Sequence, residues 1–338
     1  MNVSVVRPTE LGAGELTAWS EIQKENPCFD NPFVSPGFAV AVGRVQPSAR
    51  VAILEDEGGV AGFFPFEVAG SRVGKPICAR LSDAQALVHR DDFEWGAADL
   101  LKKCDLDVWE FRRLIEPQWL GAGRVVDRKR PSPVVELDLG YDAYLDGHRS
   151  TIKKINAQRR RLERDQGSGR FELHSTDPAA LELLREWKSA QYRRAERWDR
   201  MSEPWVVRLL DDLFENPTDG CVAVLSALHA GERTVAVHLG LRTKSTLSYW
   251  LPAYDPGASR YSPGLALLLA IIEAAPAAGI HRVDMGTGDE EYKRRLMTGE
   301  LHVAEGRFER PSTRALVRRI WQRVAAPAAH EGTKLLAE

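Results

Sequence analysis

The chain has 338 residues, a length that corresponds to about two domains of ordinary size. Hydrophobic residues make up 43% and charged residues 28%, which is typical of a folded globular protein and excludes a disordered or low-complexity chain. Because 46 Lys and Arg nearly balance 48 Asp and Glu, the net charge is −2. The chain therefore has no global positive field, and we expect no DNA partner.

The cysteines and the hydropathy pattern indicate where the protein acts. The four cysteines form no CxxC pair and no Cys/His spacing that suits zinc, so we expect reduced thiols and no metal site. The amino terminus lacks the pattern of a signal peptide, and the longest apolar run, residues 265–272, is far shorter than the roughly 20 residues that span a bilayer. We expect a cytoplasmic protein, or one bound peripherally to the inner face of the cytoplasmic membrane.

In the first part of the chain, the alternation of residues predicts a β-hairpin. Residues 51–54 and 60–66 are strand-like, and a turn at Glu57-Gly58-Gly59 separates them. Residues 95–104 have helical spacing, and residues 106–111 again indicate a strand.

The middle of the chain begins with Pro131-Ser132-Pro133, which we interpret as a hinge between two halves. Residues 148–170 are helical and carry eight Lys or Arg against two acidic residues. This segment is either a solvated helix surface or a site that attracts an anionic cofactor or lipid. A second helix is predicted over residues 178–197.

The second part of the chain repeats the pattern of the first. Residues 221–225, 235–241 and 246–251 predict an antiparallel meander, and a helix that begins at Pro263 precedes a strand at residues 282–285. The repetition indicates an internal duplication. The predicted fold class is α+β, with helices on a mixed, mostly antiparallel sheet.

Two loops are candidate binding elements. Residues 255–264 open a helix, with Ser262 as the expected N-cap, so that free backbone N–H groups could bind a pyrophosphate; an ordinary helix start is the alternative. Residues 284–293 follow a strand, and their two glycines would let a ligand approach the backbone. Asp289 and Lys293 would lie one helical turn apart, either in a site or as a surface ion pair.

His238 lies in an apolar strand between small residues on its own face, Ala236 and Gly240. Two interpretations stay open for it: a histidine packed in the core, or a residue that transfers protons near neutral pH.

Four blocks together resemble the CelD-like acyltransferases of the GNAT superfamily, which are related to the FemABX peptidyltransferases. The blocks are residues 238–242, 249–256, 260–264 and 284–293. The resemblance implies tandem GNAT-like domains: a degenerate domain at 1–130, a catalytic domain at 134–310 that binds acyl-CoA as co-substrate, and a tail at 311–338.

The resemblance also implies roles for single residues. The loop that would hold the CoA pyrophosphate contains Ser259, Arg260, Tyr261, Ser262 and Gly264. His238 and Asp289 are candidates for the base that deprotonates an acceptor amine, and Tyr292 for the donor to the leaving thiolate. The acceptor or acyl group would contact Trp250, Tyr254, Asp284, Gly286, Gly288 and Lys293.

The expected function is transfer of an acyl group from acyl-CoA to the amine of a cell-envelope precursor. The acceptor would be an amino sugar of an exopolysaccharide or a long-chain sphingoid amine, as in bacterial ceramide synthesis. The alternatives are a FemABX-like transferase that uses aminoacyl-tRNA, and a non-catalytic scaffold that binds a regulatory nucleotide or a partner protein. The sequence leaves acyl length and oligomeric state open.

The C-terminal segment, residues 311–326, predicts a helix with one apolar stripe that is bordered by arginines. Such a helix suits either docking on the domain or contact with an anionic bilayer, where it would meet a lipid acceptor.

Overall fold

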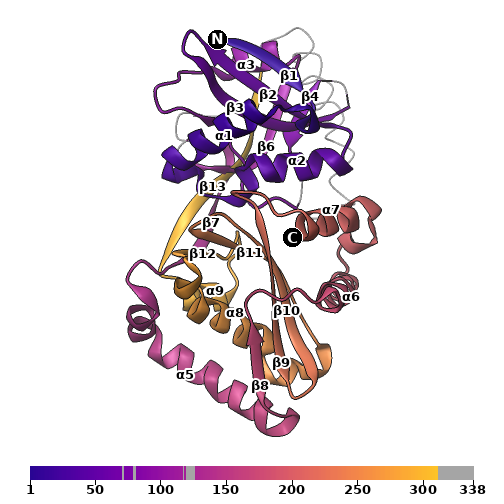
Figure 1. Ribbon diagram of the computed structural model, residues 1–338, viewed down its shortest axis with the longest axis vertical. Helices are drawn as coiled ribbons and strands as arrows, with labels where there is room; N and C mark the ends of the chain where they lie inside the picture. Colours follow the sequence, from indigo (N-terminus) through magenta and orange to yellow (C-terminus); the bar gives the residue numbers. More distant parts are fainter. Residues whose placement is uncertain (71, 79–80, 117, 119–125, 311–338) are drawn as a thin grey trace, which may run out of the picture.

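The computed structural model describes residues 1–70, 72–78, 81–116, 118 and 126–310, and it builds them around a single sheet with helices on both faces (Figure 1). The strands are β1 (Asn2–Val6), β2 (Ala49–Asp56), β3 (Gly59–Ala69), β4 (Val73–Pro76), β5 (Val88–His89), β6 (Val108–Ile115), β7 (Val126–Glu136), β8 (Gly169–Glu172), β9 (Val222–Ala230), β10 (Arg233–Arg242), β11 (Thr246–Tyr254), β12 (Arg282–Asp284) and β13 (Gly299–Glu309). The α-helices are α1 (Ala13–Glu25), α2 (Pro36–Val45), α3 (Ala97–Lys103), α5 (Gly140–Gln166), α6 (Pro178–Arg194), α7 (Pro204–Glu215), α8 (Pro263–Ala274) and α9 (Glu291–Leu296). Short 3-10 helices include η5 (Arg200–Ser202) and η6 (Pro256–Tyr261).

The order of the strands shows that the sheet consists of two similar halves. One half runs β1-β2-β3-β4-β6-β13, the other runs β8-β9-β10-β11-β12-β7, and β13 pairs with β7 where they meet. Each half has an antiparallel meander, then a parallel pair (β4 with β6, β11 with β12), then an antiparallel strand. The predicted duplication, the mixed sheet and the α+β class are confirmed.

The last strand of each half comes from a part of the chain that is separate from the meander of that half. The first half ends on β13, which comes from the C-terminal end of the described chain, and the second half ends on β7, which precedes its meander. In Figure 1, β13 runs from the lower half into the upper one.

The predicted hinge at residues 131–133 is wrong, because these residues lie inside β7 and pair with β13. The carbonyl of Pro133 accepts a hydrogen bond from the Met285 amide, so the main chain of Pro133 is directed toward β12. Because β12 ends at Asp284, it has no residue that would pair with Pro133. The missing N–H of this proline therefore costs no hydrogen bond between the strands. The division into domains at 1–130 and 134–310 stays a prediction.

Helices cover the two faces of the sheet differently. On one face a single core runs across both halves and contains residues of α1, α2, α6 and α7, among them Trp19, Phe38, Leu184 and Leu209. On the opposite face each half has its own core, with α3 on the first half and α5, α8 and α9 on the second. The shared core couples the halves by burial of apolar surface as well as by strand pairing.

The predicted helical segments are confirmed, with shifted ends: α5 begins eight residues earlier than expected, and α6 ends at Arg194. The expected helix at 311–326 lies outside the described residues, so its membrane role stays a prediction. Among the described helices, none is long and apolar enough to cross a membrane.

A carboxylate from the first half also ties the two halves together. Asp30 accepts hydrogen bonds from three hydroxyl groups of the turn that joins β10 and β11: from Ser245 at 2.8 Å, from Thr246 at 2.6 Å and from Thr243. Hydrogen bonds to a charged acceptor are the stronger kind, so this contact holds the turn against the first half.

We expect Asp30→Ala to lower the free energy of unfolding by about 2 to 4 kcal/mol, because three hydroxyl groups lose a charged acceptor. Urea denaturation measures the change. Asp30→Asn is the control, because it keeps one acceptor oxygen and should recover part of the loss. An Asp30→Ala variant as stable as the wild type would contradict this account.

Candidate functional site

The candidate site lies where β11 and β12 diverge. The two strands pair in parallel over only three positions, from Thr246 with Arg282 to Ser248 with Asp284. Beyond this point β12 ends while β11 continues to Tyr254, still paired with β10 on its other side. Along its second half, β11 therefore presents an edge that no described strand covers, although Lys188 donates a hydrogen bond to the Pro252 carbonyl there.

A β-bulge in β11 sets which side chains face this region. Leu239 pairs with Leu251 and Leu241 with Ser248, so Tyr249 and Trp250 together oppose Gly240. Tyr249 packs into the core beside α8, whereas Trp250 packs into the core shared by both halves. The Trp250 indole donates a hydrogen bond to the Leu81 carbonyl at 2.8 Å, which brings a loop of the first half to the site.

His238 lies in the interior. Its ring is fully buried and stacks on Tyr249 with the ring centroids 4.4 Å apart, and neither ring nitrogen has a hydrogen-bond partner among the described residues. Burial and the Lys188 ammonium lower the pKa of His238 to about 3, so the ring is neutral at pH 7. A Cβ at Gly240 would lie only 2.5 Å from the imidazole, so the glycine makes room for it.

The loop after β12 forms a second wall of the site. Asp284 is buried and accepts hydrogen bonds from Ser132 Oγ and the Gly286 amide, both at 2.9 Å. Burial raises the pKa of Asp284 to about 6, although these two hydrogen bonds oppose the shift. Gly286 has φ +70° and Gly288 has φ +151°, values that favour glycine.

Lys293 is buried, and it holds this loop. Its ammonium donates to the carbonyls of Gly286 at 3.2 Å and Thr287 at 3.1 Å, and it pairs with Glu290 at 3.2 Å. Of the two interpretations of Asp289 and Lys293, the surface pair is wrong, because α9 begins only at Glu291 and Lys293 pairs with Glu290 instead. Asp289 is exposed.

Tyr292, on α9, is partly buried, and burial together with the nearby Glu290 carboxylate raises the pKa of its phenol. Its hydroxyl therefore keeps its proton at neutral pH and is able to donate it.

The predicted anion loop is η6 and the start of α8. Ser262 occupies the N-cap position of α8 in a left-handed conformation, but its side chain makes no capping bond. The Gly264 amide has no backbone partner among the described residues, whereas the Leu265 and Ala266 amides donate to the Ser262 carbonyl. A free amide at the positive end of a helix is a favourable place for a phosphate group.

One side chain of this loop is buried and anchors it, whereas others are exposed to solvent. Tyr261 is fully buried and donates to an Asp165 carboxylate oxygen on α5 at 2.6 Å, so it fixes the loop rather than facing a ligand. Arg260 contacts the Tyr261 hydroxyl and remains largely exposed. Ser259 is exposed, and the ring of Tyr254 lies against Gly264.

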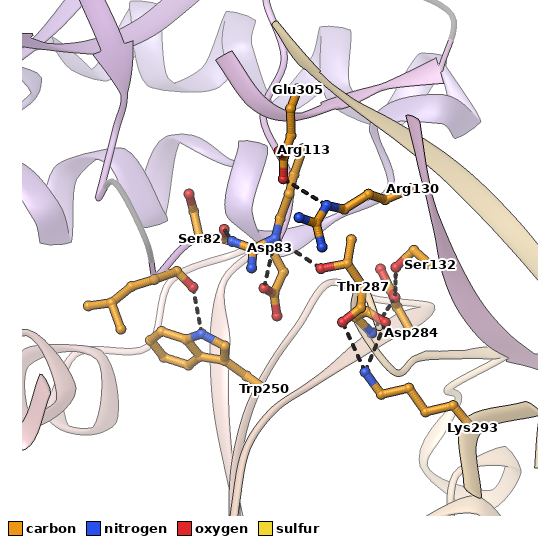
Figure 2. A network of polar contacts seen from close by, with 12 residues as sticks. Ser82, Asp83, Arg113, Arg130, Ser132, Trp250, Asp284, Thr287, Lys293 and Glu305 are labelled. Atoms are coloured by element: carbon orange, nitrogen blue, oxygen red, sulfur yellow. Dashed lines mark hydrogen bonds and ion pairs between the residues drawn. The ribbon is translucent and has the colours of Figure 1, made fainter. Parts of the chain in front are cut away.

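The first half contributes polar groups that the sequence analysis missed (Figure 2). Arg113 on β6 donates to Thr287 Oγ1 at 3.2 Å and to the Ser82 carbonyl at 2.9 Å, and it lies 3.6 Å from an Asp83 carboxylate oxygen. The other Asp83 oxygen would be 3.2 Å from a Cβ at Gly286, so this glycine permits the close approach of the carboxylate. Burial raises the pKa of Asp83, although cations, Arg113 foremost, oppose the shift.

No local pattern marks Asp83 or Arg113, because pairing between distant strands brings them to the site. Lys188 also belongs to this region, since its ammonium donates to the Pro252 carbonyl of β11 at 2.8 Å. The sequence could have indicated that Lys188 is buried, because it follows Leu181 and Leu184 at helical spacing and therefore lies on the buried face of α6.

Comparisons with known proteins bear on the fold. Residues 149–294 match a family model described as an acetyltransferase (GNAT) domain. Among solved structures, FemX is 12% identical with a TM-score of 0.63, over 95% of this chain and 100% of that chain. The C-terminal domain of a putative lysylphosphatidylglycerol synthetase from Agrobacterium fabrum is 15% identical with a TM-score of 0.53, over 91% and 97%.

A third similar structure is L-PGS from Bacillus licheniformis, which is 14% identical with a TM-score of 0.52, over 93% of this chain and 96% of that chain. No protein of curated function matches the sequence. At these identities the structural similarity concerns the fold, and the chain has the fold of a GNAT-type acyltransferase.

The raised pKa of Asp284 predicts a dependence of stability on pH. Because the folded state holds the proton up to about pH 6 and the unfolded chain only to about pH 4, stability is lost as the pH rises through this window. Between about pH 4 and about pH 6, the unfolding free energy of the wild type should fall by up to about 3 kcal/mol relative to that of Asp284→Asn. Urea denaturation of both proteins at several pH values measures the difference. A difference that stays constant with pH would contradict the buried, protonated carboxyl group.

Proposed function

We propose that the protein is an N-acyltransferase of the CelD-like type that transfers an acyl group from acyl-CoA to an amine of a cell-envelope precursor. The observation that carries the proposal is the uncovered edge of β11 beside β12, which leads to a free amide at the start of α8. Both features lie within the segment that matches the GNAT acetyltransferase model.

The residues of the second half fit acyl-CoA as the donor. The Gly264 amide, Ser259 and Arg260 would hold its phosphate groups at the helix start. The uncovered stretch of β11 would lie along the extended part of the molecule, and its main chain offers hydrogen bonds except at Pro252, which has no N–H and whose carbonyl accepts from Lys188. Acyl-CoA supplies an activated acyl group when it is bound.

The chain's own residues would then handle the proton and the charge. An acceptor amine has to lose a proton during attack, and an oxygen that becomes negative has to receive hydrogen bonds. With a pKa of about 3, His238 is a poor base, and we assign it to positioning Tyr249. Asp289, exposed on the loop before α9, is the proposed base, and Tyr292 the proposed donor to the leaving group.

A transferase that uses aminoacyl-tRNA is the second candidate. The similarity in fold to FemX and the exposed basic residues of α5, such as Lys153, Lys154, Arg160 and Arg164, favour it. A shift of tRNA mobility that high salt abolishes would support this candidate, because phosphate contacts weaken as salt rises. Stabilisation of the protein by CoA supports the first.

Calorimetry tests the donor. We expect one CoA to bind per chain, because the first half has no counterpart of the loop at residues 255–264. Arg260→Gln should weaken binding by about tenfold, the effect of removing one charge-assisted hydrogen bond. Arg233→Gln is the matched control, because Arg233 lies on β10 and contacts the other end of the same loop through Asp255. Two equivalent CoA sites per chain, or none, would overturn this assignment.

Steady-state kinetics tests the base, once mass spectrometry of envelope lipids and glycans after gene deletion has identified the acceptor. We expect Asp289→Asn to lower kcat by about ten- to a hundredfold, the usual contribution of a general base, and to leave the melting temperature unchanged because the side chain is exposed. His238→Ala should instead lower the melting temperature, because it removes a buried ring. The opposite pattern would make His238 the base.

A further inference from the structure

Lys188 is a buried cation that forms no ion pair among the described residues. It lies on the inner face of α6 and is only 8% exposed. Its ammonium donates to the Pro252 carbonyl at 2.8 Å and to Gln191 Oε1 at 3.1 Å, both of which are neutral acceptors. It forms no ion pair with any carboxylate in the part of the chain that the structure describes.

A second cation without an ion pair among the described residues, Arg200, contacts the same aromatic ring as Lys188. The Arg200 guanidinium of η5 is 5.6 Å from the centre of the Tyr192 ring, and Lys188 Nζ is 5.7 Å from the same ring centre. Within the described ranges, Arg200 also has no carboxylate within ion-pair distance. Two positive charges are therefore held next to one aromatic ring.

The other charged groups that face Lys188 do not neutralise this pair. Asp83, from the first half, lies 3.6 Å from Arg113 and also interacts electrostatically with Lys293, Arg200 and Lys188, so one carboxylate is shared among four cations. His238, which lies on β10, is neutral at pH 7. Burial and Arg200 lower the pKa of Lys188 to about 8, while Asp83 opposes the shift, so the ammonium is mostly charged at pH 7.

A buried charge without a partner costs several kcal/mol, which a protein recovers when a ligand supplies the opposite charge. Lysine and arginine side by side are the usual partners of a phosphate or a carboxylate group. The hydrogen bond to the Pro252 carbonyl places Lys188 at the strand edge where the acyl donor is proposed to bind.

We propose that Lys188 and Arg200 bind an anionic group, a phosphate or a carboxylate, that the amine acceptor carries close to its nucleophilic nitrogen. The inference rests on the proposed acyl transfer, because it names the class of acceptor. A free long-chain amine lacks such a group and would leave both cations unpaired.

Calorimetry with three small amines tests the inference on the full chain. The probes are phosphoethanolamine, β-alanine and ethanolamine, which carry a phosphate, a carboxylate and no anionic group. Saturating CoA is present, so that the loop before α8 is occupied. We expect one of the two acidic amines to bind at least about tenfold more tightly than ethanolamine, because charge-assisted hydrogen bonds contribute about that much. The stronger of the two identifies the anionic group.

Variants locate the binding. Lys188→Met and Arg200→Gln should each abolish the preference for the acidic amine, whereas Arg208→Gln, on the exposed side of α7, should keep it. Equal affinities for all three probes, or a preference that survives both substitutions, would overturn the inference. CoA binding is measured separately. If CoA fails to bind, that result contradicts the proposed donor but does not decide whether Lys188 and Arg200 bind an acidic amine.

The pH dependence separates a direct contact from a structural role. Affinity for the acidic amine should be constant up to about pH 8 and fall above it, because Lys188 loses its charge there. Lys188→Arg keeps the charge and removes the titration, so its affinity should stay level from pH 7 to 9. A parallel fall in both proteins would overturn the contact, even if Lys188→Met fails to fold.

Discussion

The pairing of β13 with β6 on one side and with β7 on the other determines how the site is assembled. Through β6 it places Arg113 beside the loop that follows β12. Backbone hydrogen bonds between Gln85 and β6 then position the preceding residues, Ser82 and Asp83. One strand from the end of the described chain thus aligns groups from both halves to within hydrogen-bond distance.

This arrangement gives the two halves different tasks. The second half supplies the divergent strands and the helix start that suit an acyl donor. The first half lacks the corresponding loop, yet it supplies Asp83 and Arg113 and receives the Trp250 indole through the Leu81 carbonyl. The first half is therefore part of the candidate site, because it completes the surroundings of the groups that the second half supplies.

The sequence was informative where structure is local. Both meanders, α6 and the helix at Pro263 were predictable, because alternation, helical spacing and turn residues act over a few positions. The sequence was misleading at β7, where two prolines suggested a hinge; they are tolerated only because β12 ends before reaching them. The cluster around Asp83 could not be predicted, since it depends on strands paired across most of the chain.

The position of β13 also has a consequence for biosynthesis. The ribosome releases β6 long before β13, so during translation the first half has an open edge with unpaired backbone groups. Its own core contains Trp109 and Phe111 of β6, against which Phe308 of β13 finally packs. The nascent first half is therefore exposed to strand-to-strand association until β13 emerges, and the sheet of the first half is completed only after the second half has been synthesised.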